Sequence, residues 1–587
     1  MYHLHQMQRL LPRRLAVSWS GFRRVVPIGF IGGNRRSGIS GALGDGWRVL
    51  QLLCCLFLLA PMLALALAAT QAEPELMRHL MATRLPTYLA NTLILMLGTA
   101  ALATFCGVAT AWMISRYRFP LCRWLSWMLV LPAAVPAYII AYTYTDLLEY
   151  AGPVQTALRH SFNWNTATDY WFPDIRSMPG AVLVMASVLY PYVYILARTA
   201  FDLTETRLCE AATLAAQPLF RNVALPLARP AIVAGMAVVM METVSDFGTV
   251  DYFALETLTL GIFNIWLGMN SLEAAAQLSM IAFLLITTLL GLEHLARARR
   301  QFTTNSKNKT GLPQITLRGA KKYAAALACS TPLVLGFIIP VAVLLLSSLP
   351  VYWHASNPVG WAQKSGLLVN TITDTLGLAA IAACLCMAMA TLVAVIARYR
   401  GTRLNRTAAA AAACGYAFPG TILAIGVLAL VKGVDDTANS LILFLLPSQS
   451  ATHTPLLAGS IAVLLIAYMV RFQAPAWGAV QAGIKRLPPH LMEASRTLGQ
   501  GFASSLMRVL MPLLRPSMLA GMLLVFVDVM KELPLTLLLR PFDFETLATL
   551  TYQFAKDEML EEAALPALLI VIAGMAPVIL LNRAIRR

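Results

Sequence analysis

The sequence predicts an all-α membrane protein that crosses the bilayer about twelve times. Of its 587 residues, 58% are hydrophobic and only 12% are charged, and the mean hydropathy is +0.68. A soluble domain does not sustain such a composition, whereas a polytopic membrane protein does. The apolar residues also gather into runs of about 20 residues or more, the length that an α-helix needs to cross the hydrocarbon core. Six runs lie in each half of the chain, which predicts two homologous six-helix halves.

The runs define the expected spans and the domain boundaries. Those of the first half lie near 47–69, 89–115, 124–148, 179–201, 230–250 and 274–296. Those of the second half lie near 324–349, 369–397, 406–432, 456–479, 516–540 and 563–582. Residues 1–46 hold seven arginines and a single acid, and we expect a basic cytoplasmic tail there. Residues 298–322 form a basic linker, so that the two permease-like domains cover 47–297 and 323–587.

The basic residues predict the orientation of the chain. They cluster in the tail, in the linker, at the C-terminus and in the turns after Arg116 and Arg398, and all these segments fall on one side if the N-terminus is cytoplasmic. Both termini are therefore expected in the cytoplasm. The net charge of +17 follows from this orientation, because the basic residues do not form an aromatic-laced face of the kind that binds nucleic acid.

No motif indicates a catalytic or metal centre. The nine cysteines lie mostly in apolar runs without a CxxC pair, and the eight histidines lie mostly in loops and at helix ends. Buried thiols that fill helix contacts are the expected state, and neither a zinc site nor a cofactor is predicted. The sequence contains no GxxxxGK[ST] phosphate loop, so the chain is not its own ATPase, and it is not predicted to be an enzyme.

The two halves repeat one another in sequence. Asn91-Thr-Leu-Ile returns as Asn370-Thr-Ile-Thr, and Arg116-Tyr-Arg returns as Arg398-Tyr-Arg. Because each half holds an even number of spans, both halves enter the membrane in the same direction. A pseudo-twofold axis along the membrane normal is therefore expected to relate them.

A short polar stretch between the fourth and fifth spans occurs once in each half, over residues 205–230 and 488–516. Each copy begins with Glu followed by small residues and ends at a proline that is expected to end its helix. The residues of the first copy are Glu210, Ala211, Ala212, Ala215 and Pro226, and those of the second are Glu493, Ala494, Ser495, Gly499 and Pro512. The narrow face made by the small residues lets a groove of another protein approach the backbone closely.

This pattern resembles the cytoplasmic coupling loop, the EAA loop, of binding-protein-dependent ABC importer permeases. The resemblance covers the chain from about residue 47 onward and implies a type I importer permease in the bacterial inner membrane. It also implies a cytoplasmic ATPase dimer, with one subunit per loop and ATP bound by that partner, and a periplasmic substrate-binding protein. The first copy departs from the pattern, since Ala215 or Ala216 stands where the glycine is expected and the interval to the proline is 226 − 210 = 16 residues, against 512 − 493 = 19.

Two acidic residues stand in the fifth span of each half or at its end, four in all. Counted from Pro230 and Pro516, Glu242 and Asp528 lie at +12, and Asp246 and Glu532 lie at +16. A spacing of four places each pair on one face of a helix. A charge within a span is costly and usually faces a cavity or the bundle interior, so the four carboxylates are candidates for lining one pathway.

Carboxylate oxygens suit hard cations, which predicts a cationic substrate such as ferric iron. The alternative is that the acids bind neighbouring helices, or pair with Lys531, and serve structure or gating. The stretches from Glu242 to Phe253 and from Lys531 to Phe542 resemble the fused two-domain permeases of ferric iron importers, and thiamine permeases share that layout. A secondary transporter is the alternative from a different class, although such a protein needs no pair of coupling loops.

Overall fold

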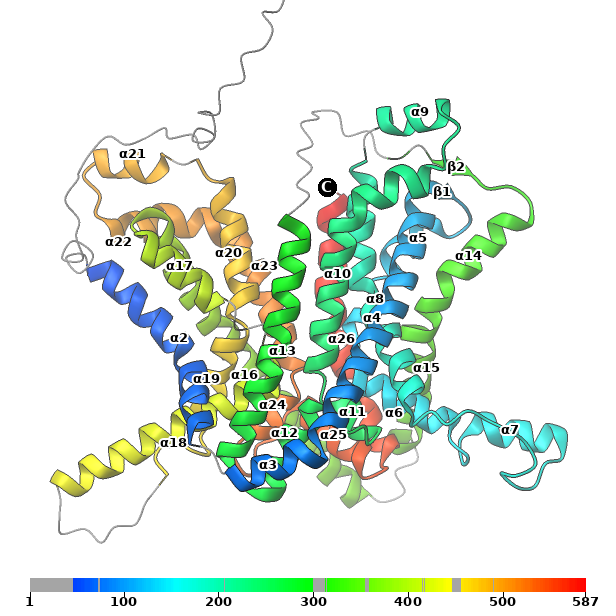
Figure 1. Ribbon diagram of the computed structural model, residues 1–587, viewed down its shortest axis with the longest axis horizontal. Coiled ribbons are helices and arrows are strands. Elements are labelled where there is room, and N and C mark those ends of the chain that lie inside the picture. Colours follow the sequence, from blue (N-terminus) through cyan, green and yellow to red (C-terminus); the bar gives the residue numbers. More distant parts are fainter. Residues whose placement is uncertain are drawn as a thin grey trace, which may run out of the picture.

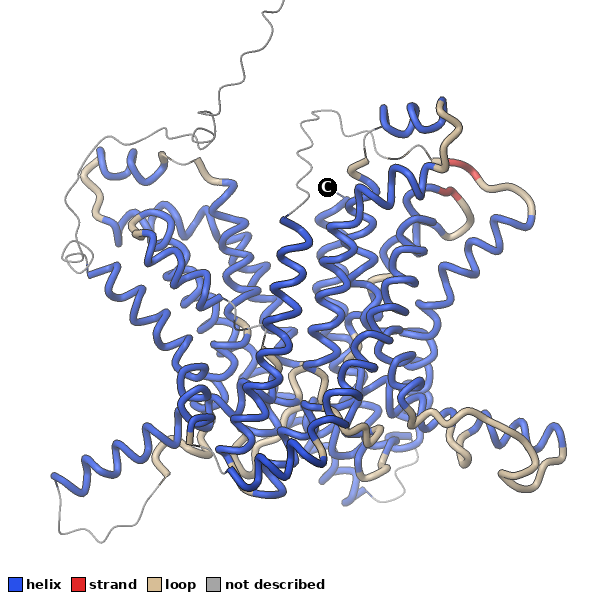
Figure 2. The backbone as a smooth tube through the Cα atoms, viewed as in Figure 1, coloured by secondary structure: helices blue, strands red, loops and turns tan. Residues whose placement is uncertain are grey.

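The chain folds into two helical lobes that diverge toward one face of the molecule (Figure 1). The computed structural model describes residues 46–71, 74–204, 206–298, 312, 314–353, 358–413, 415, 418–445, 455–488 and 490–586. The expected tail over 1–46 lies, apart from residue 46, outside these described residues. Within them the chain is almost entirely helical, and the strands are confined to one short pair (Figure 2).

The elements of the first half follow the expected order. They are α2 (Gly46–Thr70), α3 (Pro74–Thr83), α4 (Leu85–Arg116), β1 (Tyr117–Arg118), α5 (Cys122–Met128), a 3-10 turn (Leu131–Ala134), α6 (Ala137–Leu148), α7 (Pro153–Phe162), α8 (Met178–Asp202), α9 (Thr206–Leu214), a π-helical turn (Phe220–Ala224), α10 (Leu225–Ser245), α11 (Gly248–Tyr252), α12 (Leu258–Met269) and α13 (Leu272–Ala298).

The second half repeats this order with local differences. Its elements are β2 (Ile315–Thr316), α14 (Ala320–Leu333), a π-helical turn (Val334–Ile338), α15 (Ile339–Trp353), α16 (Pro358–Tyr399), α17 (Arg403–Ala412), α18 (Gly420–Leu445), α19 (Ile461–Arg471), α20 (Gln473–Arg486), α21 (Leu491–Thr497), α22 (Phe502–Ser505), a π-helical turn (Leu506–Leu510), α23 (Met511–Met530), α24 (Pro534–Leu539), α25 (Leu547–Lys556) and α26 (Leu560–Arg586).

The number of straight spans is smaller than the expected twelve. Among the described residues eight helices are long and apolar enough to cross a membrane, and ten if each of two bent pairs counts as one span. The bent pairs are Cys122–Ala134 with Ala137–Phe162, at 93°, and Ile461–Arg471 with Gln473–Arg486, at 48°. The span expected near 406–432 is divided into α17 and α18, and the one near 274–296 qualifies only as a shorter apolar helix over Leu272–Thr288.

The first helix of each half packs against the opposite half. In Figure 1, α2 lies beside α17 and α18, whereas α14 and α15 lie along the flank that holds α4, α5 and α8. Gln51 on α2 donates a hydrogen bond to the Asn405 carbonyl of α17 (2.9 Å), and the Asn405 side chain donates one back to Gln51 (2.9 Å). On the other flank, Tyr144 of α6 donates to the Leu335 carbonyl (2.7 Å). The two halves are therefore interlocked by an exchange of helices.

Two glycines allow this exchange by removing the side chain at the contact. A Cβ on Gly426 of α18 would lie 2.6 Å from the Pro61 carbonyl oxygen of α2. A Cβ on Gly336, in the turn before α15, would lie 2.2 Å from the Ser187 carbonyl oxygen of α8. Both distances are shorter than any real Cβ contact, so each crossing requires glycine.

The end of the linker that the structure describes is attached to the first half. Ile315–Thr316 pairs in parallel with Tyr117–Arg118, and Arg118 donates to the Gln314 side chain (2.7 Å). This pairing fixes the end of the linker, just before α14 enters the bundle, beside the turn that follows α4.

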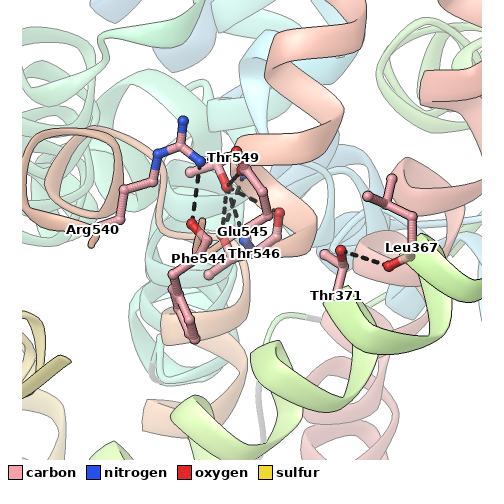
Figure 3. A network of polar contacts seen from close by, with 7 residues as sticks. All are labelled: Leu367, Thr371, Arg540, Phe544, Glu545, Thr546 and Thr549. Atoms are coloured by element: carbon pink, nitrogen blue, oxygen red, sulfur yellow. Dashed lines mark hydrogen bonds and ion pairs between the residues drawn. The ribbon is translucent and has the colours of Figure 1, made fainter. Parts of the chain in front are cut away.

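Each fifth span is followed by a broken segment of short helices. The helices α12 and α25 begin at the N-cap threonines Thr257 and Thr546. The backbone N–H of the next residue, Leu258, donates a hydrogen bond to the Thr92 hydroxyl of α4 (3.0 Å). In the second half, the N–H of Leu547 donates to the Thr375 hydroxyl of α16 (2.9 Å). Thr375 thus takes the place of Thr92, although the sequence repeat aligned Thr92 with a residue one helical turn earlier. Figure 3 shows the start of α25, where Arg540 pairs with Glu545.

Candidate functional site

The two predicted coupling stretches form short helices on the same face of the molecule. These are α9 and α21, which lie at the tips of the two diverging lobes (Figure 1). Each helix buries the residue before its glutamate and the residue two positions after it: Cys209 and Ala212 in α9, and Met492 and Ser495 in α21. Ser495 is fixed further by a hydrogen bond to Ser505 of α22 (2.7 Å). Burial raises the pKa of the Cys209 thiol, which therefore stays neutral.

The opposite faces of α9 and α21 point outward. Glu210, Ala211 and Ala215 are exposed in the first copy, and Glu493, Ala494 and Gly499 in the second. The two buried members of the predicted set, Ala212 and Ser495, hold the helices on the bundle instead. Pro226 and Pro512 lie within the first turn of α10 and α23.

The expectation that these prolines end the coupling helices is wrong. The coupling helices end earlier, at Leu214 and Thr497. Pro226 and Pro512 instead lie just after the π-helical turns Phe220–Ala224 and Leu506–Leu510, within the continuous helices Phe220–Ser245 and Phe502–Met530 that form the fifth spans.

A residue in the left-handed conformation terminates each coupling helix. Gly499 has φ = +78°, and Ala216 has φ = +52° at the same point of the first copy. The hydrogen bonds match: Gly499 N–H donates to the Arg496 carbonyl and Gln500 N–H to the Ser495 carbonyl, while Ala216 and Gln217 repeat both bonds in the first copy. This is the Schellman cap of a helix C-terminus, so Ala216, rather than Ala215, occupies the glycine position.

Sequence reasoning did not single out two leucines on this face. Leu214 at the end of α9 is 89% exposed, and Leu498 directly after α21 is 80% exposed. Each leucine lies next to the exposed face of its coupling helix and is therefore a candidate for contact with a partner. Their signal was present in the sequence as the last large apolar residue before each cap.

The four predicted acids line one cavity between the two halves. The cavity has a volume of about 130 Å³ and is reached by Glu242 and Asp246 from α10 and its end, and by Asp528 and Glu532 from α23 and its end. Gly248, at the start of α11, lets the chain pack closely here, since a Cβ at this position would lie 2.7 Å from Tyr138 Cβ and 2.8 Å from Leu533 Cδ2 of the second half.

Two cations share the cavity with these acids. Lys531, directly after the end of α23, lies 2.8 Å from Asp528 of that helix. Arg471, at the bend between α19 and α20, lies 3.3 Å from Glu532. The Arg471 and Glu532 side chains are only 10% and 7% exposed. Tyr138, Tyr192 and Ser245 also line the cavity, and the Tyr138 hydroxyl has no hydrogen-bond partner among the described residues.

The spacing predicted that each pair of acids lies on one face of a continuous helix, and this prediction is wrong. The helix α10 ends at Ser245 and α23 ends at Met530, so that Asp246 and Glu532 follow the helix ends. Each of these two carboxylates accepts a hydrogen bond from the N–H three residues later: Thr249 at 2.9 Å and Leu535 at 3.2 Å. The chain turns at Phe247 and Leu533 to begin the short helices α11 and α24. These two acids therefore cap helices as well as face the cavity.

The arrangement lines a cavity and does not form a chelating cluster. Within the described part of the chain, no group of three His, Cys, Asp or Glu side chains is placed to hold a metal ion. If all six charged groups are ionised, four carboxylates face two cations, and the cavity keeps two negative charges. Such a surface attracts a cation without enclosing it.

The second half of the chain matches a known family. Residues 390–587 match the model of the binding-protein-dependent transport system inner membrane component. Over its length, the chain is similar to an Fe(3+)-transport system permease protein of Haemophilus influenzae, with 24% identity over 539 residues that cover 90% of this chain and 96% of the relative.

Two further relatives carry other substrates in their names. A probable molybdenum ABC transporter permease protein of Haloferax volcanii is 28% identical over 258 residues, which cover 42% of this chain and 90% of the relative. A sulfate transport system permease protein of Salmonella typhimurium is 27% identical over 214 residues, which cover 35% of this chain and 72% of the relative.

Proposed function

We propose that this chain, a multi-pass permease of the binding-protein-dependent ABC importer class, moves ferric iron across the inner membrane into the cytoplasm. A periplasmic binding protein would deliver the ion, and a separate cytoplasmic ATPase dimer would drive the cycle. In this assignment the face that carries α9 and α21 is cytoplasmic. The C-terminal end of α26 lies on that face as well (Figure 1).

The observation that carries the proposal is the convergence of four carboxylates from both halves on one cavity. Oxygen donors of this kind suit a hard, highly charged cation. The cavity volume of about 130 Å³ is below the roughly 300–1,000 Å³ that is typical of sites for organic ligands, which favours an ion over thiamine. The relative that aligns with nearly the whole chain is a ferric iron permease, which supports the same choice.

The shape of the molecule supports alternating access. The lobes diverge toward the coupling face and meet at the opposite face, so the structure has the form of an inward-open state (Figure 1). ATP-driven closure of the ATPase dimer would draw α9 and α21 together. Because the helices of each lobe pack as a unit, this movement would open the opposite end toward the binding protein, and hydrolysis would reset the lobes.

The test is uptake of radiolabelled iron(III) in cells with and without the protein, with thiamine, molybdate and sulfate measured in parallel. The Asp246→Asn/Glu532→Gln double variant keeps hydrogen-bonding side chains at both helix caps while it removes two charges from the cavity. Iron uptake that requires the protein, and that falls in a double variant still inserted and bound to the ATPase, is the expected result. Protein-dependent uptake of another solute instead of iron would refute the iron assignment.

The partners of the protein distinguish an ABC importer permease from a secondary transporter. The permease purified in mild detergent should retain an ATPase subunit, and disruption of α9 and α21 together should release it. Replacing Glu493 or Gly499 with a bulky residue should uncouple transport while leaving membrane insertion intact. Normal uptake in both variants would refute the assignment of α21 as a docking helix.

A further inference from the structure

The cation that faces Glu532 in the cavity is part of the protein itself. Arg471 stands at the last position of α19, where the chain bends by 48° into α20. Its Nε lies 3.3 Å from Glu532 Oε2, and both side chains are at least nine-tenths buried. A positive charge at this place in a cation pathway would repel the substrate unless it moves.

The guanidinium is held less firmly than a structural buried arginine. An arginine has five N–H donors, and a stable buried ion pair normally satisfies them with good geometry. Arg471 Nε and Nη1 make no hydrogen bond among the described residues, although Nε is within ion-pair distance of Glu532. The Glu532 carboxylate, by contrast, is fixed by the Leu535 N–H that it accepts (3.2 Å). The carboxylate is therefore anchored by the backbone, whereas the guanidinium is held by the ion pair and by the Phe472 ring, whose centroid lies 5.9 Å from Arg471 Cζ. The cation is the partner with fewer hydrogen bonds to break.

The surrounding backbone makes room for the guanidinium. A Cβ on Gly420, at the start of α18, would lie 2.6 Å from Arg471 Nη1 and 2.9 Å from Glu532 Oε1. The pair therefore occupies a space that exists only because residue 420 has no side chain.

The first half of the repeat has no such cation. Counting back from the coupling glutamates, Arg471 lies 493 − 471 = 22 residues before Glu493, and the position 22 residues before Glu210 is Val188. Val188 also lines the cavity. The tethered charge is thus a feature of one half alone. The fold that the two halves share does not require it.

We propose that Arg471 determines the charge selectivity of the permease, as a resident cation that the incoming metal ion must displace from Glu532. This inference rests on the proposed transport of a cation. A tethered group competes at an effective concentration in the millimolar range or above, so a monovalent ion does not displace it. Attraction to a carboxylate grows in proportion to the charge of the ion, and a trivalent ion therefore competes best.

The proposal is tested by competition in cells that express the permease system. Uptake of labelled iron(III), supplied as its nitrilotriacetate complex, is measured with and without excess Mn²⁺, for the wild type and for Arg471→Met. We expect the wild type to be insensitive to Mn²⁺. Arg471→Met should show a KM for iron that is lower by about threefold or more, a reduced maximal rate, and inhibition by Mn²⁺. A merely structural arginine would change the amount of folded permease and leave this selectivity unchanged.

Three further variants separate charge from folding. Arg471→Lys keeps a tethered cation and should keep the wild-type selectivity. Gly420→Ala keeps the charge but displaces the guanidinium, so it should show the Mn²⁺ sensitivity of Arg471→Met to a smaller degree, and it serves as the test if Arg471→Met does not fold. The matched control is Arg198→Met, at a partly buried arginine of α8 outside the cavity, which should behave as the wild type.

The outcomes are distinguishable from failure of the proposed function. If the wild type imports no iron, the proposed function is refuted. If it imports iron and both Arg471→Met and Gly420→Ala keep the wild-type KM and remain insensitive to Mn²⁺, the role of Arg471 is refuted while the function stands. Loss of uptake of molybdate or sulfate in Arg471→Met would identify Arg471 as an anion ligand and overturn the proposal.

Discussion

Lys556 of α25 lies 3.1 Å from Asp251 of α11, and this ion pair joins the second half of the chain to the first. Tyr552, one turn earlier on α25, donates to the same carboxylate. Arg176 with Glu558 (3.9 Å) and Lys432 with Glu273 (3.0 Å) are further ion pairs between the halves. The helices α11 and α25 lie at the end of the molecule where the lobes meet, away from α9 and α21 (Figure 1). The cluster is thus placed to hold this end closed, which is the outer end in the proposed orientation.

Removing this ion pair should favour opening of the outer end. Lys556→Met leaves Asp251 without its cation, and a partly exposed pair of this kind contributes about 0.5–1 kcal/mol, which corresponds to a change of about two- to fivefold in the equilibrium between the two states. We expect basal ATP hydrolysis by the complete transporter to rise by that factor in the absence of binding protein. The measurement is steady-state ATPase activity in lipid nanodiscs.

The matched control for this variant is Lys321→Met, which removes an exposed lysine at the start of α14 on the opposite side of the molecule. It should leave the basal rate unchanged. An unchanged rate in Lys556→Met, with normal assembly, would show that the pair does not hold the outer end closed.

Opposite substitutions at the caps of the two coupling helices should have opposite effects on ATPase binding. A residue other than glycine in the left-handed conformation costs about 1 kcal/mol. Gly499→Ala should therefore weaken ATPase binding by about fivefold, whereas Ala216→Gly should strengthen it, because it relieves the strain at φ = +52°. Titration of the labelled ATPase against reconstituted permease measures both constants. Equal affinities in the two variants would mean that the caps do not preorganise the loops.

The exposed leucines of the coupling face should carry part of the docking energy. Full burial of a leucine contributes about 1.5–3 kcal/mol, so Leu498→Ser is expected to weaken ATPase binding by roughly tenfold or more. Leu214→Ser should act similarly. Leu519→Ser, at an exposed position of α23 away from the coupling face, is the control for lost hydrophobicity. Wild-type affinity in both loop variants would place the ATPase elsewhere.

The anchor between α2 and α17 should be sensitive to removal of one partner. Gln51→Leu leaves the buried Asn405 carbonyl without the amide that now donates to it, and an unpaired buried polar group costs about 1–3 kcal/mol. A lower unfolding temperature in detergent is expected. Gln71→Leu, at an exposed residue just past the end of α2, should have no effect. Equal unfolding temperatures for the two variants would contradict the anchoring role.

The sequence predicted those parts of the site that repeat. The coupling loops were found because two copies of one motif stood between equivalent spans, and the four acids because they stood at equal distances from Pro230 and Pro516. The same reasoning passed over Arg471, which occurs once, although a basic residue inside the run 456–479 was as unusual as the acids. A search for every charge within a span, whether repeated or not, would have found it.

Other features depend on contacts that periodicity does not contain. The ends of α10 and α23 were misplaced because hydropathy continues through the break, while Phe247-Gly248 and Leu533-Pro534 marked the turn. The exchange of α2 and α14 between the halves is a matter of tertiary packing. Gly426 and Gly336 allow these close contacts, but a glycine in an apolar run does not indicate which segment packs against it.

The packing of α2 against the second half means that its partner is synthesised long after α2 itself. The helix α2 is complete at residue 70, but its partner α17 begins at residue 403, which is 403 − 70 = 333 residues later. At roughly 5–20 residues per second, the ribosome takes about 20–70 s to cover that interval. During this time Gln51 lacks the Asn405 partner that it has in the folded protein. The nascent chain therefore depends on lipid, or on the insertion machinery, to accommodate α2 until the second half has been synthesised.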